Sequence, residues 1–409
     1  MGIFNSLRRA EQRAVTVVPK EVWRSLIGAS TASGVTVTPD LALKVAVVYA
    51  CVSHLADSVA MLPLNLYQDD SDNDQKNAVL ARRNPLYNLI KHRPNRWQTS
   101  FEWRRMMAGH MLLRGNGYSR IISQRNGVDE LIPMHPDRTT PFFGDDGDIY
   151  YHYQPSRGPA EILLREEVHH WRAFGGDLLG APSPIQLHAE TIGLSMAALE
   201  HGARVFKNGA ISTGLLSHPK TLSDPAYNRL QSSFAEKYVG LANHHKPILL
   251  EEGMTFEKLS LNADEVQMLE TRVHQVSEVC SIWRMNPLLI GHGDKTSTWG
   301  TGVEQITIGH LTFTLSPVLR MVEQAMQRDL LSLRDLDTGH YVRFTDNALL
   351  RVDLKSKAEY YKAAIGGNNG PGWMDRNEVR ALEDLNARDG LSEFVDPAAY
   401  KSQPKEGGA

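Results

Sequence analysis

The sequence predicts an α+β fold in which a mixed region of helices and strands precedes two long helices and a small insertion. Three observations lead to this prediction. Short apolar helical patterns alternate with strand-like runs up to about residue 174. Two long stretches between 183 and 286 then repeat apolar residues at helical spacing. The segment between them, 210–261, returns to short strands and turns, so it reads as a module inserted between two helices.

Length and composition exclude several classes of protein. The chain has 409 residues, of which 42% are hydrophobic and 22% are charged, and these values are typical of an ordered globular protein. Its net charge of −3 argues against a basic protein that coats nucleic acid. Cys51 and Cys280 are the only cysteines, too few for a disulfide framework or a thiolate metal site, and they suit a reducing compartment.

The first forty residues mix charge with Ser, Thr and Gly and are expected to form a loosely held arm. Their start, Met-Gly-Ile-Phe-Asn-Ser, matches the N-myristoylation pattern, which keeps a membrane-associated scaffold as an alternative. The most apolar stretch, 45–62, contains His54 and Asp57 and is too polar to span a membrane. We therefore expect no membrane association.

The region up to 174 is predicted to combine helices with antiparallel strands. A buried helix over 41–60 leads into a strand over 63–68, and NPLYNLIKHRPN gives a short helix that stops near Pro94. The helix SFEWRRMMAGHMLLRG, capped by Ser100, precedes a hairpin whose turn is Asn126-Gly127. Further strands are expected in TTPFF, DIYYHYQ and EEVHHWRA.

Two long helices are the most distinctive prediction. The first begins at the N-cap Ser183, with Pro184 in its first turn, and stops at Asn208-Gly209. The second begins at Asn262 and is ended by Pro287, so each is on the order of 30–40 Å long. Their apolar residues recur every three, four or seven positions: Ile185, Ile192, Met196, Leu199, Ala203 and Phe206, then Val266, Leu269, Val273, Val276, Cys280 and Trp283.

The C-terminal region is predicted to be mainly helical. A helix over 303–333 is expected to bend near Ser316-Pro317. A strand (HYVRFTD) and two helices (SKAEYYKAAIGG and MDRNEVRALEDL) follow, and the tail 396–409 is expected to be flexible.

The loop GHGDKTSTWGTG (291–302) has the composition of a functional loop. A phosphate-binding loop would need a glycine directly before its lysine and a strand in front of it. Here Asp294 precedes Lys295, and the preceding element is a helix that ends in Asn-Pro. The sequence therefore favours a flexible connection between helices over a nucleotide site.

Metal and catalytic sites are not expected. His169 and His170 follow Glu166 and Glu167 on a strand, where neighbouring side chains point to opposite faces and cannot share one ion. His244-His245 precedes Pro247 in a turn and is expected to be solvated. No nucleophile elbow and no close carboxylate pair is recognisable, so we predict no enzyme activity and no cofactor.

A basic run with interleaved tryptophans could contact nucleic acid, which keeps open a nucleic-acid-processing enzyme or a DNA-binding subunit as the alternative function. It could equally be a solvated face, or half of a subunit interface with the acidic run Asp69, Asp70, Asp72 and Asp74. The run, over 82–105, consists of Arg82, Arg83, Lys91, Arg93, Arg96, Trp97, Trp103, Arg104 and Arg105.

Four segments in order resemble the portal proteins of tailed phages, of the type shared by HK97-like phages. They are EEVHHWRAFGGDLLGAPSPIQLHAETI (166–192), FKNGAISTGLL (206–216), VCSIWRMNPLLIGHG continuing to TWGTGVEQ (279–305), and GWMDRNEVRALEDL (372–385). Each is short, but their order covers most of the chain.

This resemblance implies a ring of identical subunits, a dodecamer in the particle, through which double-stranded DNA is packaged and ejected. It implies a portal-type fold divided as follows: an N-terminal arm (1–40), a wing in two parts (41–182 and 287–354), two stem helices (183–209 and 262–286), a clip (210–261), a crown (355–395) and a tail (396–409). The second part of the wing would hold the tunnel loop 291–302 and the long helix 303–333.

The resemblance also implies partners and a place. The ring would dock the large terminase and the head–tail connector, contact the major capsid and scaffold proteins, and occupy one vertex of the virion after assembly in the host cytoplasm. The tunnel loop would face DNA through His292, Asp294, Lys295, Thr296, Ser297, Thr298 and Trp299. Docking residues of the clip would be Lys220, Arg229, Lys237, His244, His245 and Lys246.

Overall fold

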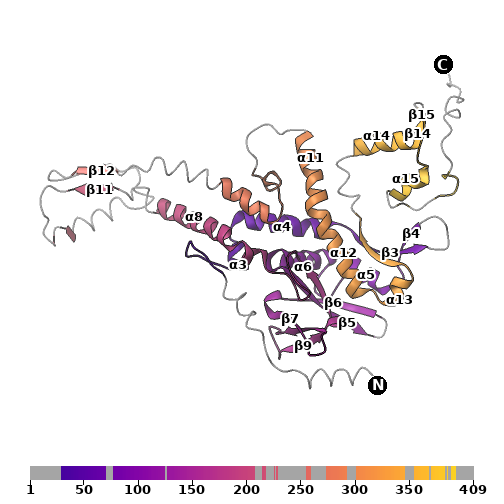
Figure 1. Cartoon of the computed structure of the whole chain (residues 1–409), viewed down its shortest axis with the longest axis horizontal. Coiled ribbons are helices and arrows are strands. Elements are labelled where there is room, and N and C mark those ends of the chain that lie inside the picture. Colours follow the sequence, from indigo (N-terminus) through magenta and orange to yellow (C-terminus); the bar gives the residue numbers. More distant parts are fainter. Residues whose placement is uncertain are drawn as a thin grey trace, which may run out of the picture.

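The chain folds into a central body of helices and small antiparallel sheets from which one helix leads away (Figure 1). This computed structural model describes residues 29–70, 77–124, 127–207, 214–217, 225, 227–228, 255–258, 273–292, 301–345, 354–367, 370–382, 385 and 388–392. The α+β class expected from the sequence is confirmed.

Two helices packed against each other, α4 (Ala46–Met61) and α6 (Ser100–Arg114), form the centre of the body. Both bury apolar residues at helical spacing, and Trp103 of α6 is fully buried. The helix α6 begins one residue earlier than expected, because its N-cap is Thr99. Thr99 and Glu102 form a reciprocal capping box, whereas Ser100 lies inside the helix.

Two three-stranded sheets flank these helices. One joins β3 (Leu64–Asp70) to β4 (Asn77–Leu80) and to the distant β13 (His340–Phe344), which ties the C-terminal half of the chain to the N-terminal half. The other has the order β10-β5-β6, with the bounds β5 (Asn116–Gln124), β6 (Gly127–Met134) and β10 (Val168–Arg172). The hairpin predicted around Asn126-Gly127 is the β5–β6 pair.

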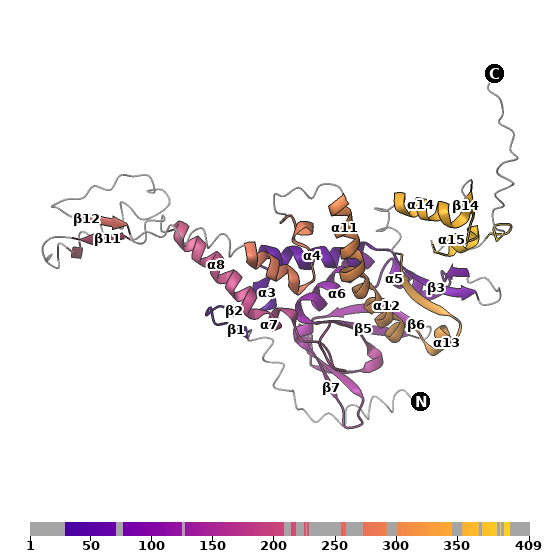
Figure 2. The same ribbon diagram turned by 45° about the horizontal axis from the view of Figure 1, so that its top comes forward.

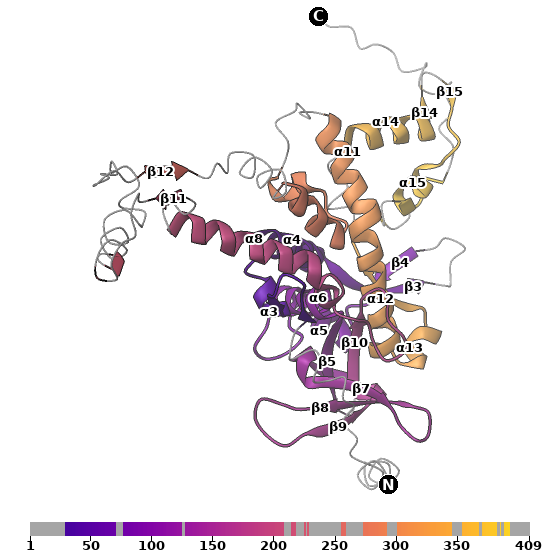
Figure 3. The same cartoon turned by 60° about the vertical axis from the view of Figure 1, so that its left-hand side comes forward.

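A third sheet stands at one end of the body (Figure 3). It has the order β7-β8-β9, and its own small core includes Tyr118, Tyr151 and Leu163. Its strands are β7 (Thr139–Phe143), β8 (Ile149–Tyr153) and β9 (Glu161–Leu164), and the 3₁₀ turns η1 (Pro136–Arg138) and η2 (Arg165–Glu167) contact it. The helix α5 (Pro85–Lys91) packs instead on β3 and β6.

The first long helix is interrupted. Ser183 caps it and Pro184 starts it as predicted, but a short α7 (Pro184–Leu187) ends at His188 before α8 (Ala189–Lys207) begins. Figure 2 shows α8 leading away from the body toward the hairpin of β11 (Gly214–Ser217) and β12 (Thr255–Lys258). The stop expected at Asn208-Gly209 lies outside the described residues.

Part of the expected arm is packed. β1 (Ala29–Ser30) and β2 (Thr36–Val37) form a hairpin, followed by α3 (Pro39–Ala42). The backbone N–H of Ala32 donates to the carboxylate of Glu190 on α8 at 3.1 Å, and Val37 is fully buried. Residues 29–40 are therefore packed on the body, although the sequence placed them in a loosely held arm.

The second long helix is described from 273 and ends at 282, five residues before Pro287. Arg284 takes a left-handed conformation with φ of 54°, which is unfavourable for a side chain with a Cβ and ends the helix. The prediction that Pro287 ends it was therefore wrong. Pro287 instead starts a 3₁₀ turn, η4 (Pro287–Ile290).

The predicted bend in the third helix is a change of helix type. α11 (Thr301–Gly309) passes into a π-helical segment, η5 (His310–Leu315), and then into α12 (Ser316–Leu330), with Pro317 in its first turn. Because proline has no N–H to donate, the wider helical turn lies just before it. α13 (Leu333–Asp337) then leads to β13.

The C-terminal elements lie to one side of the body (Figure 1). They are α14 (Leu354–Ile365), the hairpin of β14 (Gly366–Gly367) and β15 (Gly370–Pro371), and α15 (Arg376–Leu382). In the part of the chain that the structure describes, none of the helices combines the length and apolarity needed to cross a membrane.

Candidate functional site

The predicted tunnel loop is described at both of its ends. His292 is exposed, and its backbone N–H donates to the carbonyl of Pro287 at 2.9 Å. Gly291 has a φ of 84°, a conformation that favours glycine, and it turns the chain out of η4. The chain becomes helical again at Thr301. The other predicted loop residues, Asp294, Lys295, Thr296, Ser297, Thr298 and Trp299, lie outside the described residues.

All six predicted clip residues also lie outside the described part of the chain. They are Lys220, Arg229, Lys237, His244, His245 and Lys246. Their docking role stays a prediction.

The segment that leads into the loop is anchored in the body. Trp283 is 6% exposed, and its indole N–H donates to the carbonyl of Leu112 on α6 at 3.1 Å. The hydroxyl of Thr314 donates to the carbonyl of Arg284 at 2.8 Å. The backbone before the loop is thus held by α6 on one side and by the π-helical segment on the other.

A histidine pair lies where the π-helical segment meets α4. The rings of His54 and His310 contact each other edge to face with centroids 5.4 Å apart. Neither ring nitrogen of His310 has a hydrogen-bond partner among the described residues. Burial lowers the pKa of both side chains, and repulsion from His54 lowers the pKa of His310 further. Both rings are therefore neutral at pH 7.

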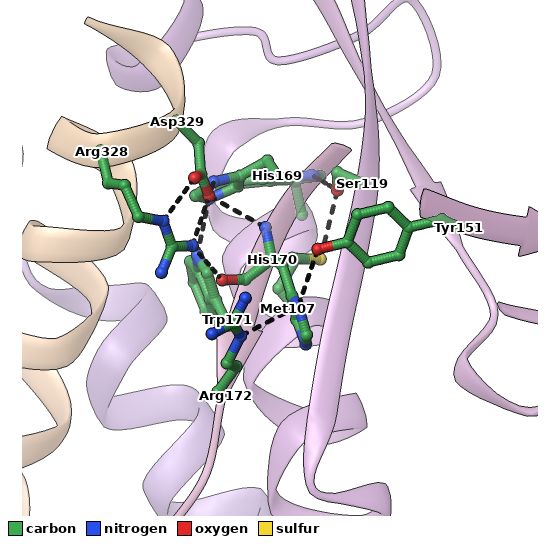
Figure 4. A network of polar contacts seen from close by, with 10 residues as sticks. Met107, Ser119, Tyr151, His169, His170, Trp171, Arg172, Arg328 and Asp329 are labelled. Atoms are coloured by element: carbon green, nitrogen blue, oxygen red, sulfur yellow. Dashed lines mark hydrogen bonds and ion pairs between the residues drawn. The ribbon is translucent and has the colours of Figure 1, made fainter. Parts of the chain in front are cut away.

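A buried polar network joins β10 to α12 (Figure 4). Asp329 accepts from both Nε and Nη2 of Arg328, at 2.6 and 2.8 Å, and from the backbone N–H of His170 at 3.0 Å. Nδ1 of His169 lies 2.9 Å from the same carboxylate. Burial raises the pKa of Asp329, but hydrogen bonds from His169 and Arg328 outweigh this effect and lower the pKa well below its ordinary value.

The tautomer of His169 follows from its partners. The indole N–H of Trp171 lies 2.6 Å from Nε2 of His169, and because an indole nitrogen only donates, that ring nitrogen must accept. The proton of the ring is therefore on Nδ1, where it is donated to Asp329. His169 is neutral, and Arg328 is the residue that balances the charge of Asp329.

His170 is held in the opposite tautomer on the other face of the strand. Its Nδ1 accepts from Nε of Arg172 at 3.2 Å, so its proton is on Nε2, which faces the side-chain oxygen of Asn116 at 3.0 Å. Asn116 is itself oriented by the backbone of Ala181. Burial, followed by repulsion from Arg172 and Arg328, lowers the pKa of His170 well below its ordinary value.

The two histidines thus lie on opposite faces, as expected from the sequence, and cannot share a metal ion. In the described ranges no group of three or more His, Cys, Asp or Glu side chains could hold a metal ion. The arrangement fixes α12 on the sheet. It offers neither a nucleophile nor a free general base, because the polar atoms of both rings are used in hydrogen bonds within the chain.

The basic run predicted as a nucleic-acid surface is divided between the interior and separate surface pairs. Arg104 is 7% exposed, donates to the carbonyls of Leu62 and Ser100, and has its pKa lowered by burial to about 10. Lys91 donates to the side chain of Asn65 at 2.6 Å, and Trp103 is fully buried.

The outer members of the run pair with carboxylates. Arg96 pairs with Glu130 at 3.3 Å and lies 5.0 Å from the ring of Trp97, while Arg105 pairs with Asp57. Only Arg82, Arg83 and Arg93 remain as exposed members of the run for which the described residues offer no ion pair. The described members of the run therefore do not form the continuous basic surface that a nucleic-acid-processing enzyme would need.

Sequence reasoning missed the network around Asp329 and a second buried ion pair. Arg114 is 8% exposed and pairs with Asp40 and Asp137, each at 2.9 Å. A charged residue on the apolar face of an otherwise amphipathic helix was the available signal for Arg114.

In the described residues, buried polar groups connect the elements of the body to one another, and α8 leads away from the body. Comparisons with known proteins show to which family the chain belongs. A family model described as "Phage portal protein" matches residues 46–384. The chain belongs to the phage portal protein family.

Relatives and solved structures agree with this family. The chain is 28% identical over 348 residues to the portal protein of Enterobacteria phage HK97, covering 84% of this chain and 79% of the relative. It is 29% identical over 411 residues to the probable portal protein of Streptomyces phage phiC31, covering 96% and 88%.

The fold is also similar to solved structures. A chain in the virion of a native gene transfer agent particle aligns with a TM-score of 0.61 at 21% identity, covering 86% of this chain and 94% of that one. An HK97-family phage portal protein from Corynebacterium diphtheriae aligns with a TM-score of 0.54 at 16% identity, covering 77% and 98%.

Proposed function

We propose that this chain assembles into a ring of identical subunits that forms the channel for double-stranded DNA at one vertex of a phage capsid. The family match over 46–384 carries the proposal, because it includes both flanks of the loop 291–302. Similar folds occur in the neck of a gene transfer agent particle computed with C6 and with C12 symmetry, which supports a ring of twelve. The ring would be part of the virion and would assemble in the host cytoplasm.

The exposed part of α8 supports a ring. Ile192 is fully buried in the body, whereas Leu194 is 48% exposed and Leu199 is 44% exposed. Large apolar side chains that repeat along an exposed helix are typical of surfaces that bind another subunit. In the proposed division 183–209 and 262–286 are stem helices, 210–261 is the clip, 41–182 and 287–354 are the wing, and 355–395 is the crown.

The composition of the loop suits a surface past which DNA slides. Lys295 is the only Lys or Arg in 291–302. Affinity for DNA rises with the number of phosphates neutralised, and a ring multiplies each cation by the number of subunits. One cation per loop would give light, sequence-independent contact, and many would hold the duplex in place. The proposed role needs no catalytic residue and no cofactor.

The proposed partners follow from this role. The clip would dock the large terminase during packaging and the head–tail connector afterwards, through Lys220, Arg229, Lys237, His244, His245 and Lys246. Wing and crown would contact the major capsid and scaffold proteins.

Deletion of the loop tests the channel role. Removing 292–300 should leave rings visible by negative-stain electron microscopy but reduce packaging or retention of DNA in particles. The matched control is K295A, which keeps the length of the loop and removes only its cation. Loss of rings in the deletion variant would mean that the loop is structural, and normal packaging in the deletion variant would contradict a DNA-facing role.

A further inference from the structure

A pocket lies between β10 and α12, on the outer side of the polar network. Its volume is about 480 Å³, and its walls include His170, Arg172, Arg320, Met321, Gln324 and Arg328. Three of the residues that line it are arginines, and none is acidic. Figure 4 shows Arg172 and Arg328 approaching His170 from two different elements.

The two carboxylates closest in sequence to the arginines of the pocket already have partners within the chain. Asp329 is held by Arg328 and His169. Glu323 is 5% exposed, accepts from the backbone N–H of Phe344 at 2.8 Å, and pairs with Arg320 at 3.0 Å. Neither acid lines the pocket, and each pairs with an arginine that does: Glu323 with Arg320, and Asp329 with Arg328.

Among the described residues, no carboxylate pairs with Arg172. Arg172 donates to His170, whose ring is neutral in the tautomer derived above. Three guanidinium groups thus face two carboxylates, and the surplus positive charge lies in an open pocket. Like charges held together in this way favour the binding of an anion.

The position of the pocket decides between anions. Arg320 lies nineteen residues beyond Thr301, where the helix that follows the loop begins, which is on the order of 30 Å along the helix axis. If the loop touches the DNA, the pocket is too far from the duplex for a phosphate contact. A carboxylate is the other planar oxyanion that matches the fork of an arginine. The ring of the proposed function brings a second copy of this chain against every subunit, and that copy carries carboxylates.

We propose that the pocket of Arg172, Arg320 and Arg328 binds an acidic side chain of a neighbouring copy of this chain and so fixes the angle between adjacent subunits. The inference rests on the ring in the proposed function. A heterologous contact suits it, because a ring places different surfaces of two identical chains against each other. The contact would set orientation and salt sensitivity more than total affinity.

Charge reversal at the mouth of the pocket tests the contact. The side chain of Arg320 is 60% exposed but pairs with the buried Glu323, so R320E should lower the stability of the chain while leaving it folded. It should raise the protein concentration at which half of the chains are in rings by about tenfold or more. Wild-type rings should also dissociate as NaCl is raised, and R320E should remove most of that salt dependence. R172Q should weaken rings in the same direction.

The matched control is R334E. Arg334 is exposed on α13, outside the pocket, so this variant makes the same change of charge on a neighbouring element. Rings of R334E should match the wild type. Equal ring formation by R320E, R334E and the wild type, with circular dichroism showing all three folded, would overturn the proposal.

A cross-linking experiment identifies the partner directly. R320K places a primary amine at the pocket, and a carbodiimide joins an amine to a carboxylate only when the two are in contact, with loss of one water molecule. Rings assembled from a mixture of ¹⁴N- and ¹⁵N-labelled R320K chains should yield a mixed-isotope cross-linked peptide pair. Cross-links within single chains alone, in rings that are intact, would overturn the proposal.

A DNA-binding experiment tests whether the anion in the pocket is instead a phosphate of DNA. Binding of a short duplex by wild-type and R320E rings, followed by fluorescence anisotropy, should be equal. Normal rings of R320E that lose affinity for the duplex would show that the pocket takes phosphate, against the proposal. Absence of rings in the wild type would contradict the proposed function itself, so the two failures are distinguishable.

Discussion

The helices α6 and α8 differ in how much of their apolar surface is covered by the rest of the chain. The helix α6 is covered by α4 and by β5 and β10 of one sheet, and even Arg104 and Arg114 have partners within the chain. On α8 only the first part is covered, where Ile192 is fully buried. Leu194 is exposed because it lies on the side of the helix opposite Ile192, and Leu199 is exposed beyond Ser195, the last buried residue of α8. A helix whose apolar pattern exceeds what its own chain covers indicates another subunit, and this difference separates the body from the assembly surface.

The largest effect on stability is expected in α6. W103A removes a fully buried indole that donates to Ser119 at 3.0 Å and packs against Trp171. The free energy of unfolding should fall by about 4 kcal/mol, measured by urea denaturation. W97A is the control, because Trp97 is 66% exposed and its removal should change stability little. Equal effects of the two variants would mean that α6 is not packed as described.

A somewhat smaller loss of stability is expected for D329A, because this change leaves the guanidinium of Arg328 without its carboxylate partner. Breaking a buried ion pair by removing one partner should lower the free energy of unfolding by about 3 kcal/mol. The difference in the free energy of unfolding between the wild type and D329A should depend on pH. The pKa of Asp329 is lower in the folded chain than in the unfolded chain, so its stabilisation is complete above about pH 4 and is lost as the pH falls further.

Denaturation of the wild type and D329A at a series of pH values measures this dependence. The gap between the two chains should narrow on acidification below about pH 4. D337A is the comparison, because Asp337 lies on the exposed side of α13 and none of the described ion pairs includes it. A gap that stays constant with pH would contradict the assignment of Asp329 as a charged partner of Arg328.

A modest loss is expected at the start of α6. T99A removes the capping hydroxyl that accepts from the N–H of Glu102 and so should cost about 1 kcal/mol of stability. S100A provides the contrast: Ser100 donates to the carbonyl of Ile90 and does not cap the helix. If Thr99 is the cap, T99S should restore most of the stability in urea denaturation. Failure of T99S to do so would assign the loss to packing of the methyl group.

The smallest effect on the stability of the single chain, with a large effect on assembly, is expected on α8. L194S/L199S should change the free energy of unfolding by less than about 0.5 kcal/mol, because both side chains are exposed. Ring formation should nevertheless be lost in analytical ultracentrifugation. H201S, at an exposed polar position of the same helix, should assemble normally. Rings that survive L194S/L199S would remove α8 from the subunit interface.

Much of the fold could be predicted because local chemistry determines it. The cap at Ser183, the hairpin of β5 and β6 and the alternation that separates His169 from His170 depend only on neighbouring residues. The end of the second long helix could not be predicted this way. It depends on Arg284, whose left-handed backbone is held by a hydrogen bond from Thr314, thirty residues farther along.

The candidate site was predictable only in part for the same reason. The loop 291–302 stood out by its glycines, and it starts at Gly291 as expected, but the helix after it begins at Thr301, two residues before the predicted start. The pocket of Arg172, Arg320 and Arg328 could not be predicted, since the charge of each arginine is normal for an exposed strand end or helix. Their meeting depends on the packing of α12 against β10, which residue spacing does not reveal.

The measurement that tests the central claim most directly is electron microscopy of the purified wild-type chain beside L194S/L199S. The wild type should form rings with a central hole and rotational symmetry, and the double variant should remain monomeric with an unchanged circular dichroism spectrum. Uniform wild-type monomers at high protein concentration and low salt would contradict the claim that this chain is the subunit of a channel.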